Sequence, residues 1–174
     1  MKNNILESER CLLREANVSD ADFILRLINQ DVWKKYISDH NINTPDLAIG
    51  YINDKLVSMY KQHGFGLWLV ELKNADRTPI GLCGLLKRDF LGKIDLGFGF
   101  LEDYWGKGLA YETAKCCVEY ASNTLKVEEV AAIVLPENQA STTLLDKLGF
   151  EYAEEIKYPG ESQQLALYQL SLCK

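Results

Sequence analysis

The 174-residue sequence predicts an α/β fold in which helices flank a mixed β-sheet. Segments with strand character and segments with helical periodicity follow one another in the order β-α-α-β-β-β-α-β-α-β-β. No internal repeat, linker or low-complexity segment separates them. The composition, with 47% hydrophobic and 25% charged residues, is that of an ordinary globular domain. We therefore expect one domain over residues 1–174, with its core in about residues 10–173.

The chain is expected to begin with a strand and a helix. The apolar run RCLLRE at residues 10–15 predicts the strand. Ser19 is the expected N-cap of a helix over residues 19–28. The following segment, residues 31–43, is aromatic and polar and has no clear period. We expect no regular element there.

A second, longer helix is predicted over residues 44–64. Thr44 is a suitable N-cap, and Pro45 fits the first helical position, where its missing N–H costs nothing. Gly64 is a typical helix stop. One face of this segment is apolar, formed by Ile49, Ile52, Leu56 and Met59.

The second half of the chain predicts most of the sheet. Turn-rich segments separate its apolar runs, which is typical of strands joined by short loops. The expected strands cover residues 65–72, 79–90, 94–101, 129–135, 152–158 and 164–172. Two helices are expected among them, one from Gly108 to about Leu125 and one over residues 140–149 that Gly149 ends.

Composition excludes several classes of function. The formal net charge is −6, which argues against a nucleic acid as the main partner because phosphate contacts need a basic face. The five cysteines show no C-x-x-C spacing, and with only two histidines no metal site is expected. No apolar run approaches the length of a membrane span. We expect free thiols and a cytoplasmic protein that does not bind membranes, either a monomer or a homodimer.

The segment EDYWGKGLAYETA, residues 102–114, is the main functional signal. It forms a turn between an apolar strand and an amphipathic helix, with glycines at positions 106 and 108. A helix N-terminus presents unpaired N–H groups, which could hold a phosphate here. The P-loop pattern is not met, and the dinucleotide pattern G-x-G-x-x-G ends instead with Tyr111. A plain glycine turn with a solvated Lys107 is the other interpretation.

Two blocks of sequence resemble the GCN5-related N-acetyltransferases (GNAT), and more narrowly their Rim-type branch. YWGKGLAYETAK resembles the acetyl-CoA loop of the family, and NQASTTLLDKLGFEYAEE resembles the branch's Asn-x-x-Ser segment. The element order agrees from about residue 11 to residue 173. Trp105 stands where the broad family has Arg or Gln, as is usual in the Rim branch.

The resemblance implies a mostly antiparallel sheet that is splayed where acetyl-CoA binds. No metal is implied. In this family the backbone of the turn holds the pyrophosphate, and the strand before it borders the pantetheine arm. The residues implied for cofactor binding are Phe98, Gly99, Phe100, Leu101, Trp105, Gly106, Lys107, Gly108, Leu109, Ala110, Asn138 and Ser141. For Phe98 and Phe100, packing in the core is the alternative.

Acetyl transfer needs a donor for the leaving thiolate, a donor for the oxyanion and a base for the amine. The resemblance places Ser141 near the thiol, although Ser141 could instead cap the helix that follows. Asn138 would bond the pantetheine amide or cap the same helix. A backbone N–H of the strand is implied for the oxyanion. Asp95 is the best candidate for the base, with a solvent-facing position as its alternative.

The resemblance implies that the acceptor is a primary amine, most readily the N-terminus of a ribosomal or other protein. Acetylation of a small amine, such as a polyamine, an amino acid or an antibiotic, is the alternative. A non-catalytic domain that binds acyl-CoA is an alternative of another class. Residues available to an acceptor site include Trp33, Tyr36, Asp39, His40, Tyr158 and Glu161. They do not identify the substrate.

Overall fold

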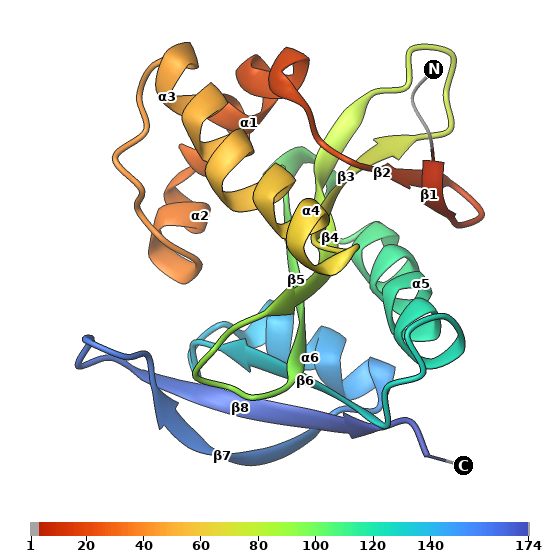
Figure 1. Cartoon of the computed structure of the whole chain (residues 1–174), viewed down its shortest axis with the longest axis vertical. Helices are drawn as coiled ribbons and strands as arrows, with labels where there is room; N and C mark the ends of the chain where they lie inside the picture. Colours follow the sequence, from red (N-terminus) through yellow and green to blue (C-terminus); the bar gives the residue numbers. More distant parts are fainter. Residues whose placement is uncertain (1–3, 174) are drawn as a thin grey trace.

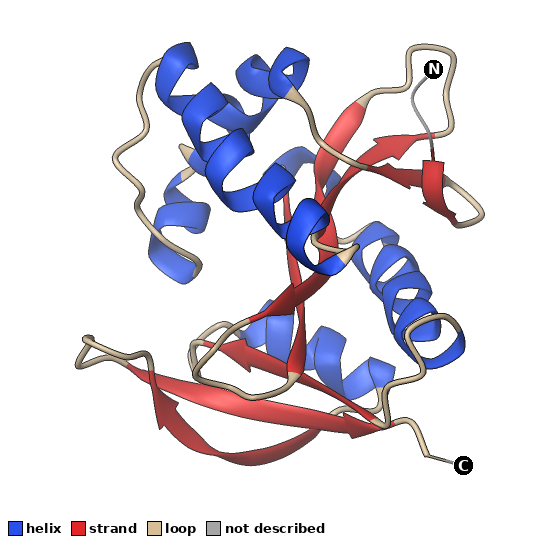
Figure 2. Cartoon of the chain, viewed as in Figure 1, coloured by secondary structure: helices blue, strands red, loops and turns tan. Residues whose placement is uncertain are grey.

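The computed structural model describes residues 4–173, so residues 1–3 and 174 of the expected domain lie outside it. It contains one sheet with helices packed around it (Figures 1 and 2). The strands are β1 (Asn4–Glu7), β2 (Cys11–Arg14), β3 (Leu67–Leu72), β4 (Pro79–Lys87), β5 (Ile94–Phe100), β6 (Glu129–Val134), β7 (Glu151–Lys157) and β8 (Gln164–Ser171). The α-helices are α1 (Ala21–Ile28), α2 (Asp31–Tyr36), α3 (Pro45–Tyr51), α4 (Ser58–His63), α5 (Leu109–Asn123) and α6 (Gln139–Leu148).

The sheet confirms the predicted fold. Its eight strands follow the order β1-β2-β3-β4-β5-β6-β8-β7. Neighbouring strands are antiparallel except β5 and β6, which are parallel and pair only at Asp95 and Ala131. Beyond that pair the two strands diverge, which leaves one edge of β5 without a partner strand. This divergence is the splay that the resemblance implies.

Two short elements were not predicted, and one cap was predicted wrongly. Strand β1 has only four residues, is mostly exposed and lies at the sheet edge, where it pairs with β2. Helix α2 has six residues, too few to show a helical period, and is held by the buried side chain of Trp33. The expected N-cap Ser19 is wrong, because Asn17 caps a 3₁₀ turn (Val18–Asp20) that leads into α1.

The predicted helix over residues 44–64 is present but not uniform. Thr44 caps α3 by accepting a hydrogen bond from the Leu47 N–H, as predicted. A π-helical segment, Ile52–Val57, then joins α3 to α4. Gly64 ends α4 with a φ of +76°, a conformation that glycine adopts without a side-chain clash.

The register of the sheet places different helices on its two faces. Trp68, Cys83 and Phe98 lie side by side on one face, where Trp68 contacts Tyr120 of α5 at 5.3 Å between ring centroids. Gly99 lies on the opposite face, against Trp33 of α2. Figure 1 shows α1 to α4 grouped beside the upper half of the sheet, α5 at the right, and β7 and β8 across the bottom. None of the helices in residues 4–173 is long and apolar enough to span a membrane.

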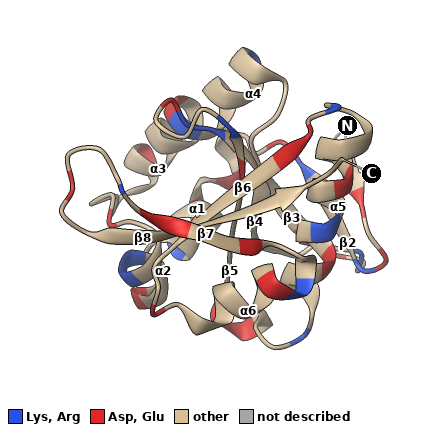
Figure 3. Ribbon diagram, turned by 90° about the horizontal axis from the view of Figure 1, so that it is seen from below, with Lys and Arg blue, Asp and Glu red and all other residues tan. Residues whose placement is uncertain are grey.

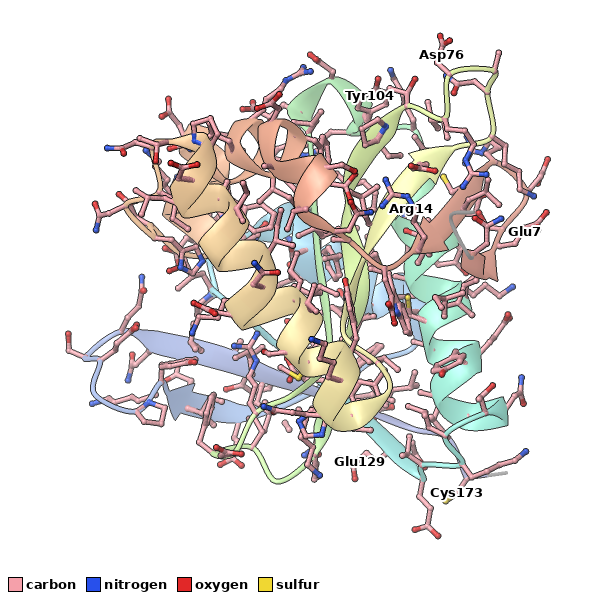
Figure 4. The ribbon with its side chains drawn as sticks, turned by 45° about the horizontal axis from the view of Figure 1, so that its top comes forward. Glu7, Arg14, Asp76, Tyr104, Glu129 and Cys173 are labelled. Carbon is pink, nitrogen blue, oxygen red and sulfur yellow. The ribbon has the colours of Figure 1, made fainter. Side chains whose placement is uncertain are left out.

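A buried ion-pair cluster joins β2, β3 and the 3₁₀ turn. The Arg14 guanidinium donates to Glu71 at 2.8 Å and to both carboxylate oxygens of Asp20 at 2.8 Å. The side chain of Arg14 is only 2% exposed, and Figure 4 shows it within the body of the molecule. Arg77 extends the cluster by donating to the second oxygen of Glu71 at 2.7 Å. This cluster fixes the N-terminal strands against the centre of the sheet.

Candidate functional site

The predicted glycine turn lies at the end of β5 and opens α5. A 3₁₀ turn, Glu102–Tyr104, follows β5, and Figure 4 shows Tyr104 at the top of the molecule, far from Glu129. Gly106 and Gly108 have φ values of +69° and +76°, so both adopt the left-handed conformation that favours glycine. Helix α5 begins at Leu109 without a side-chain cap. Its first N–H groups are therefore available to a ligand.

A cavity of about 370 Å³ adjoins this turn. This volume falls in the range of small-molecule sites. Most of the residues predicted for the cofactor line it, namely Phe98, Gly99, Phe100, Trp105, Gly106, Gly108, Leu109, Ala110, Asn138 and Ser141. Leu101 and Lys107 are not among the lining residues. The Lys107 ammonium donates instead to the Asp103 carbonyl at 2.8 Å.

The splay leaves backbone groups of β5 free at the cavity. The Leu101 N–H donates to the Ile80 carbonyl at 2.9 Å. In an antiparallel pair, alternate residues bond to the partner strand, so the N–H groups of Gly97 and Gly99 also face β4. The N–H and C=O groups of Phe98 and Phe100 therefore face the diverging β6. The Phe100 carbonyl is used, because Trp105 Nε1 donates to it at 3.0 Å.

Asn138 and Ser141 lie together at the N-terminus of α6. Asn138 is the N-cap, and its side-chain oxygen accepts from the Ser141 N–H at 3.2 Å. The alternative in which Ser141 caps this helix is therefore wrong. The half-buried hydroxyl of Ser141 has no hydrogen-bond partner within residues 4–173. It is free to interact with a ligand in the cavity that it lines.

Asp95 is buried and does not face solvent. Its side chain is 1% exposed, and it accepts hydrogen bonds from Arg88 Nε at 3.0 and 3.2 Å. Burial raises the pKa of Asp95 to about 6, and the neighbouring Arg88 charge offsets part of this effect. Asp95 is absent from the cavity wall, so its role as a base stays a prediction.

Helix α2 forms the wall of the cavity on the other face of β5. Its contributions are Val32, Trp33 and Tyr36, followed by Ile37. A Cβ atom added to Gly99 would lie 2.3 Å from Cζ3 of Trp33, so the glycine makes room for the indole. Trp33 Nε1 is buried and has no hydrogen-bond partner among the described residues. An unpaired buried donor costs roughly 1–3 kcal/mol unless a ligand or water accepts from it.

Other candidate acceptor residues lie away from this wall. His40 contacts Tyr51 at 5.0 Å between ring centroids, and Tyr158 contacts Phe90 at 4.8 Å. The sequence analysis missed Gln30, Tyr111 and Lys147, which line the cavity. Tyr111 lies on α5 and Lys147 on α6, and both helices were predicted from sequence. Their positions near the predicted cofactor residues could have identified them. Gln30 gave no such signal.

Strand β7 carries most of its charge as exposed carboxylates. Figure 3 shows Asp and Glu positions on β7 and α6, and the exposed carboxylates of β7 are Glu151, Glu154 and Glu155. Within the described residues, no three His, Cys, Asp or Glu side chains gather as metal ligands do, and the cysteines are free.

Comparison with known proteins agrees with this geometry. A family model described as an acetyltransferase (GNAT) domain matches residues 10–151. An uncharacterized N-acetyltransferase of Bacillus subtilis (strain 168), YoaA, is 26% identical over 149 residues, which cover 84% of this chain and 82% of YoaA. The uncharacterized protein YkkB of the same organism is 30% identical over 99 residues. That match covers 56% of this chain and 57% of YkkB.

Among solved structures, the chain is similar to RimL, a ribosomal L7/L12 alpha-N-protein acetyltransferase in complex with coenzyme A. The TM-score is 0.81 with 13% identity, over 97% of this chain and 98% of RimL. At this identity the similarity establishes a shared fold. It is the fold that the sheet order and the splay at β5 already define.

Proposed function

Because the chain belongs to the GNAT acetyltransferase family, we propose that this acyltransferase moves the acetyl group of acetyl-CoA to the N-terminal amine of a peptide or protein. The observation that carries the proposal is a continuous cavity whose lining runs from the uncapped N-terminus of α5 to the wall formed by α2. One end offers backbone N–H groups to an anion, and the other offers an aromatic wall to an acceptor. The two substrates would meet at the splay of β5.

The residues of the turn fit the pyrophosphate of acetyl-CoA. Gly106 and Gly108 have no side chains to obstruct it, and α5 begins without a cap. The pantetheine arm would pass along the free edge of β5. The N–H groups of Phe98 and Phe100 face the splay, and we propose that of Phe98 as the donor to the oxyanion.

In the reaction, the amine nitrogen attacks the thioester carbon, a C–N bond forms and the C–S bond breaks. The amine loses a proton and the leaving thiolate gains a hydrogen bond or a proton. We assign the second role to Ser141, because its hydroxyl is free and lines the cavity. Asp95 remains our proposed base, and its burial means that it would act through an intervening group and not by direct contact.

Trp33 is part of the aromatic wall at the proposed acceptor end of the cavity. Its indole packs against Gly99, and its Nε1 is buried. Replacement of Trp33 by Ala removes this ring from the wall, so it should reduce kcat/KM for the acceptor, with acetyl-CoA binding unchanged.

An acceptor screen tests the proposed function. The purified chain and acetyl-CoA are offered peptides that differ in their first residue, beside a panel of polyamines, amino acids and aminoglycosides. Release of free CoA and the mass of the product are measured. We expect α-amine acetylation of a subset of peptides. Acetylation of small amines alone would overturn the peptide proposal, and acetyl-CoA binding without turnover on any acceptor would indicate a non-catalytic domain.

A further inference from the structure

The turn between β1 and β2 is bonded to the start of α5, across more than a hundred residues of sequence. The Ser8 hydroxyl and the Arg10 N–H donate to one oxygen of Glu112, at 2.5 and 2.7 Å. Arg10 Nε donates to the other oxygen at 2.8 Å. Glu112 is in the first turn of α5, so this contact lies beside the predicted phosphate site.

Arg10 also bonds directly to the glycine turn. Its Nη1 donates to the Lys107 carbonyl at 3.0 Å. Its Nη2 lies 3.4 Å from the position that a Cβ atom of Gly108 would occupy. The guanidinium therefore holds the turn between two positive-φ glycines, where the backbone has the greatest freedom to change conformation.

The bond to the Lys107 carbonyl fixes the next N–H group as well. No peptide bond among the described residues is cis, and in a trans peptide the C=O and N–H groups point in opposite directions. With the Lys107 carbonyl directed to Arg10, the Gly108 N–H is directed away from Arg10. Gly108 is a lining residue of the cavity.

Arg10 also compensates a charge that would oppose anion binding. The Glu112 carboxylate is within the first turn of α5, where an anionic ligand would be stabilised. Partial burial would raise the pKa of Glu112, but the bonds from Ser8 and Arg10 outweigh it and lower this pKa, so the carboxylate is ionised at neutral pH. The Arg10 guanidinium pairs with that charge.

We propose that Arg10 is a positioning residue that orients the Gly108 N–H toward the pyrophosphate of acetyl-CoA and neutralises Glu112 beside it. This proposal rests on the proposed function, which supplies the ligand. Sequence analysis gave no sign of it, because Arg10 lies in the first strand segment and the turn lies 97 residues later. The acyl group and its thioester lie beyond the reach of this contact, so Arg10 should affect cofactor affinity and not the chemical step.

Two thioesters separate this role from a general effect on folding. Acetyl-CoA carries the pyrophosphate, whereas S-acetylpantetheine carries the same thioester without it. For Arg10→Ala we expect the Kd of acetyl-CoA by calorimetry to rise roughly 10- to 100-fold, as for loss of a charge-assisted bond. The kcat/KM with S-acetylpantetheine should stay within about twofold of native. Arg10→Lys should give an intermediate Kd, because one ammonium lacks the planar fork that reaches both Glu112 and the Lys107 carbonyl.

Lys73→Ala is the matched control. Lys73 directly follows β3 and donates to Glu7 of β1 at 2.5 Å, and no hydrogen bond joins its side chain to the glycine turn among the described residues. The Lys73→Ala variant should keep the native Kd for acetyl-CoA and the native kcat/KM with S-acetylpantetheine. Equal losses with both thioesters in Arg10→Ala, or an unchanged Kd for acetyl-CoA, would overturn the proposal for Arg10 alone. If the native chain fails to bind acetyl-CoA, the proposed function is wrong and this proposal is overturned with it.

Discussion

Replacement of Ser141 by Ala tests the assignment of the thiolate donor. Ser141 is the third residue of α6, and it contributes to the cap only through its backbone N–H, which bonds to Asn138. Alanine keeps that N–H and has the higher helix propensity. We therefore expect the free energy of unfolding to change by less than about 0.5 kcal/mol.

The effect on catalysis should be much larger. If the hydroxyl serves the leaving thiolate, Ser141→Ala removes an interaction made mainly in the transition state. We expect kcat to fall roughly 10- to 1,000-fold, which corresponds to about 1.4–4 kcal/mol. The KM for acetyl-CoA should change little.

Asn138→Ala is the matched control at the same helix end. It removes the side chain that caps α6, so it should cost about 1 kcal/mol of stability, or about 2–4 °C in Tm. The assay measures Tm and kcat at saturating acetyl-CoA on both variants. A Ser141→Ala enzyme with native kcat would refute the assignment, and a large loss of Tm in that variant would refute the account of the cap.

Three further predictions concern the turn, the buried acid and the ion-pair cluster. Gly108→Ala should strain the positive-φ turn by about 1–2 kcal/mol, seen in Tm, and should weaken acetyl-CoA binding by calorimetry. Because burial raises the pKa of Asp95 from 3.8 to about 6, the stability that its proton provides is lost as pH rises between these values. Asp95→Asn should therefore gain stability relative to native across that window in urea titrations. A pH–rate profile of the same variant tests the base role, which requires a large fall in kcat and loss of an ionisation near 6. Glu71→Ala should cost about 3–5 kcal/mol in urea unfolding, because it leaves the 2%-exposed Arg14 with one carboxylate fewer, and an unchanged midpoint would contradict this account.

The parts of the fold that local sequence determines were predicted, and those that depend on distant contacts were not. Gly64, Gly108 and Gly149 were identified as turn or stop positions from sequence, and each has positive φ. The six-residue helix α2 was missed because its stability comes from burial of Trp33 and not from its own periodicity.

The candidate site divides in the same way. The glycine turn and the start of α6 are continuous segments, so sequence analysis could identify them. The bonds of Arg10 join residues about 100 positions apart, and no local pattern reveals such a pair. The environment of Asp95 also depends on register, because its partner Arg88 follows β4 across a hairpin. Alternation along one strand could therefore not distinguish a solvated position from a buried ion pair.

The sequence LGFGF of β5 explains how one strand can serve two substrates. Glycine and phenylalanine alternate, so the phenylalanines lie on the face of α5 and the glycines on the opposite face, where Gly99 meets Trp33 of α2. Gly99 lets the Trp33 indole approach the strand, where any larger side chain would displace it. The divergence of β6 leaves the Phe98 backbone without a partner strand, and buried backbone groups need partners. A ligand that supplied those partners would bind through the backbone of β5. Backbone groups are the same for every residue type, so side-chain patterns alone do not reveal which ligand binds there.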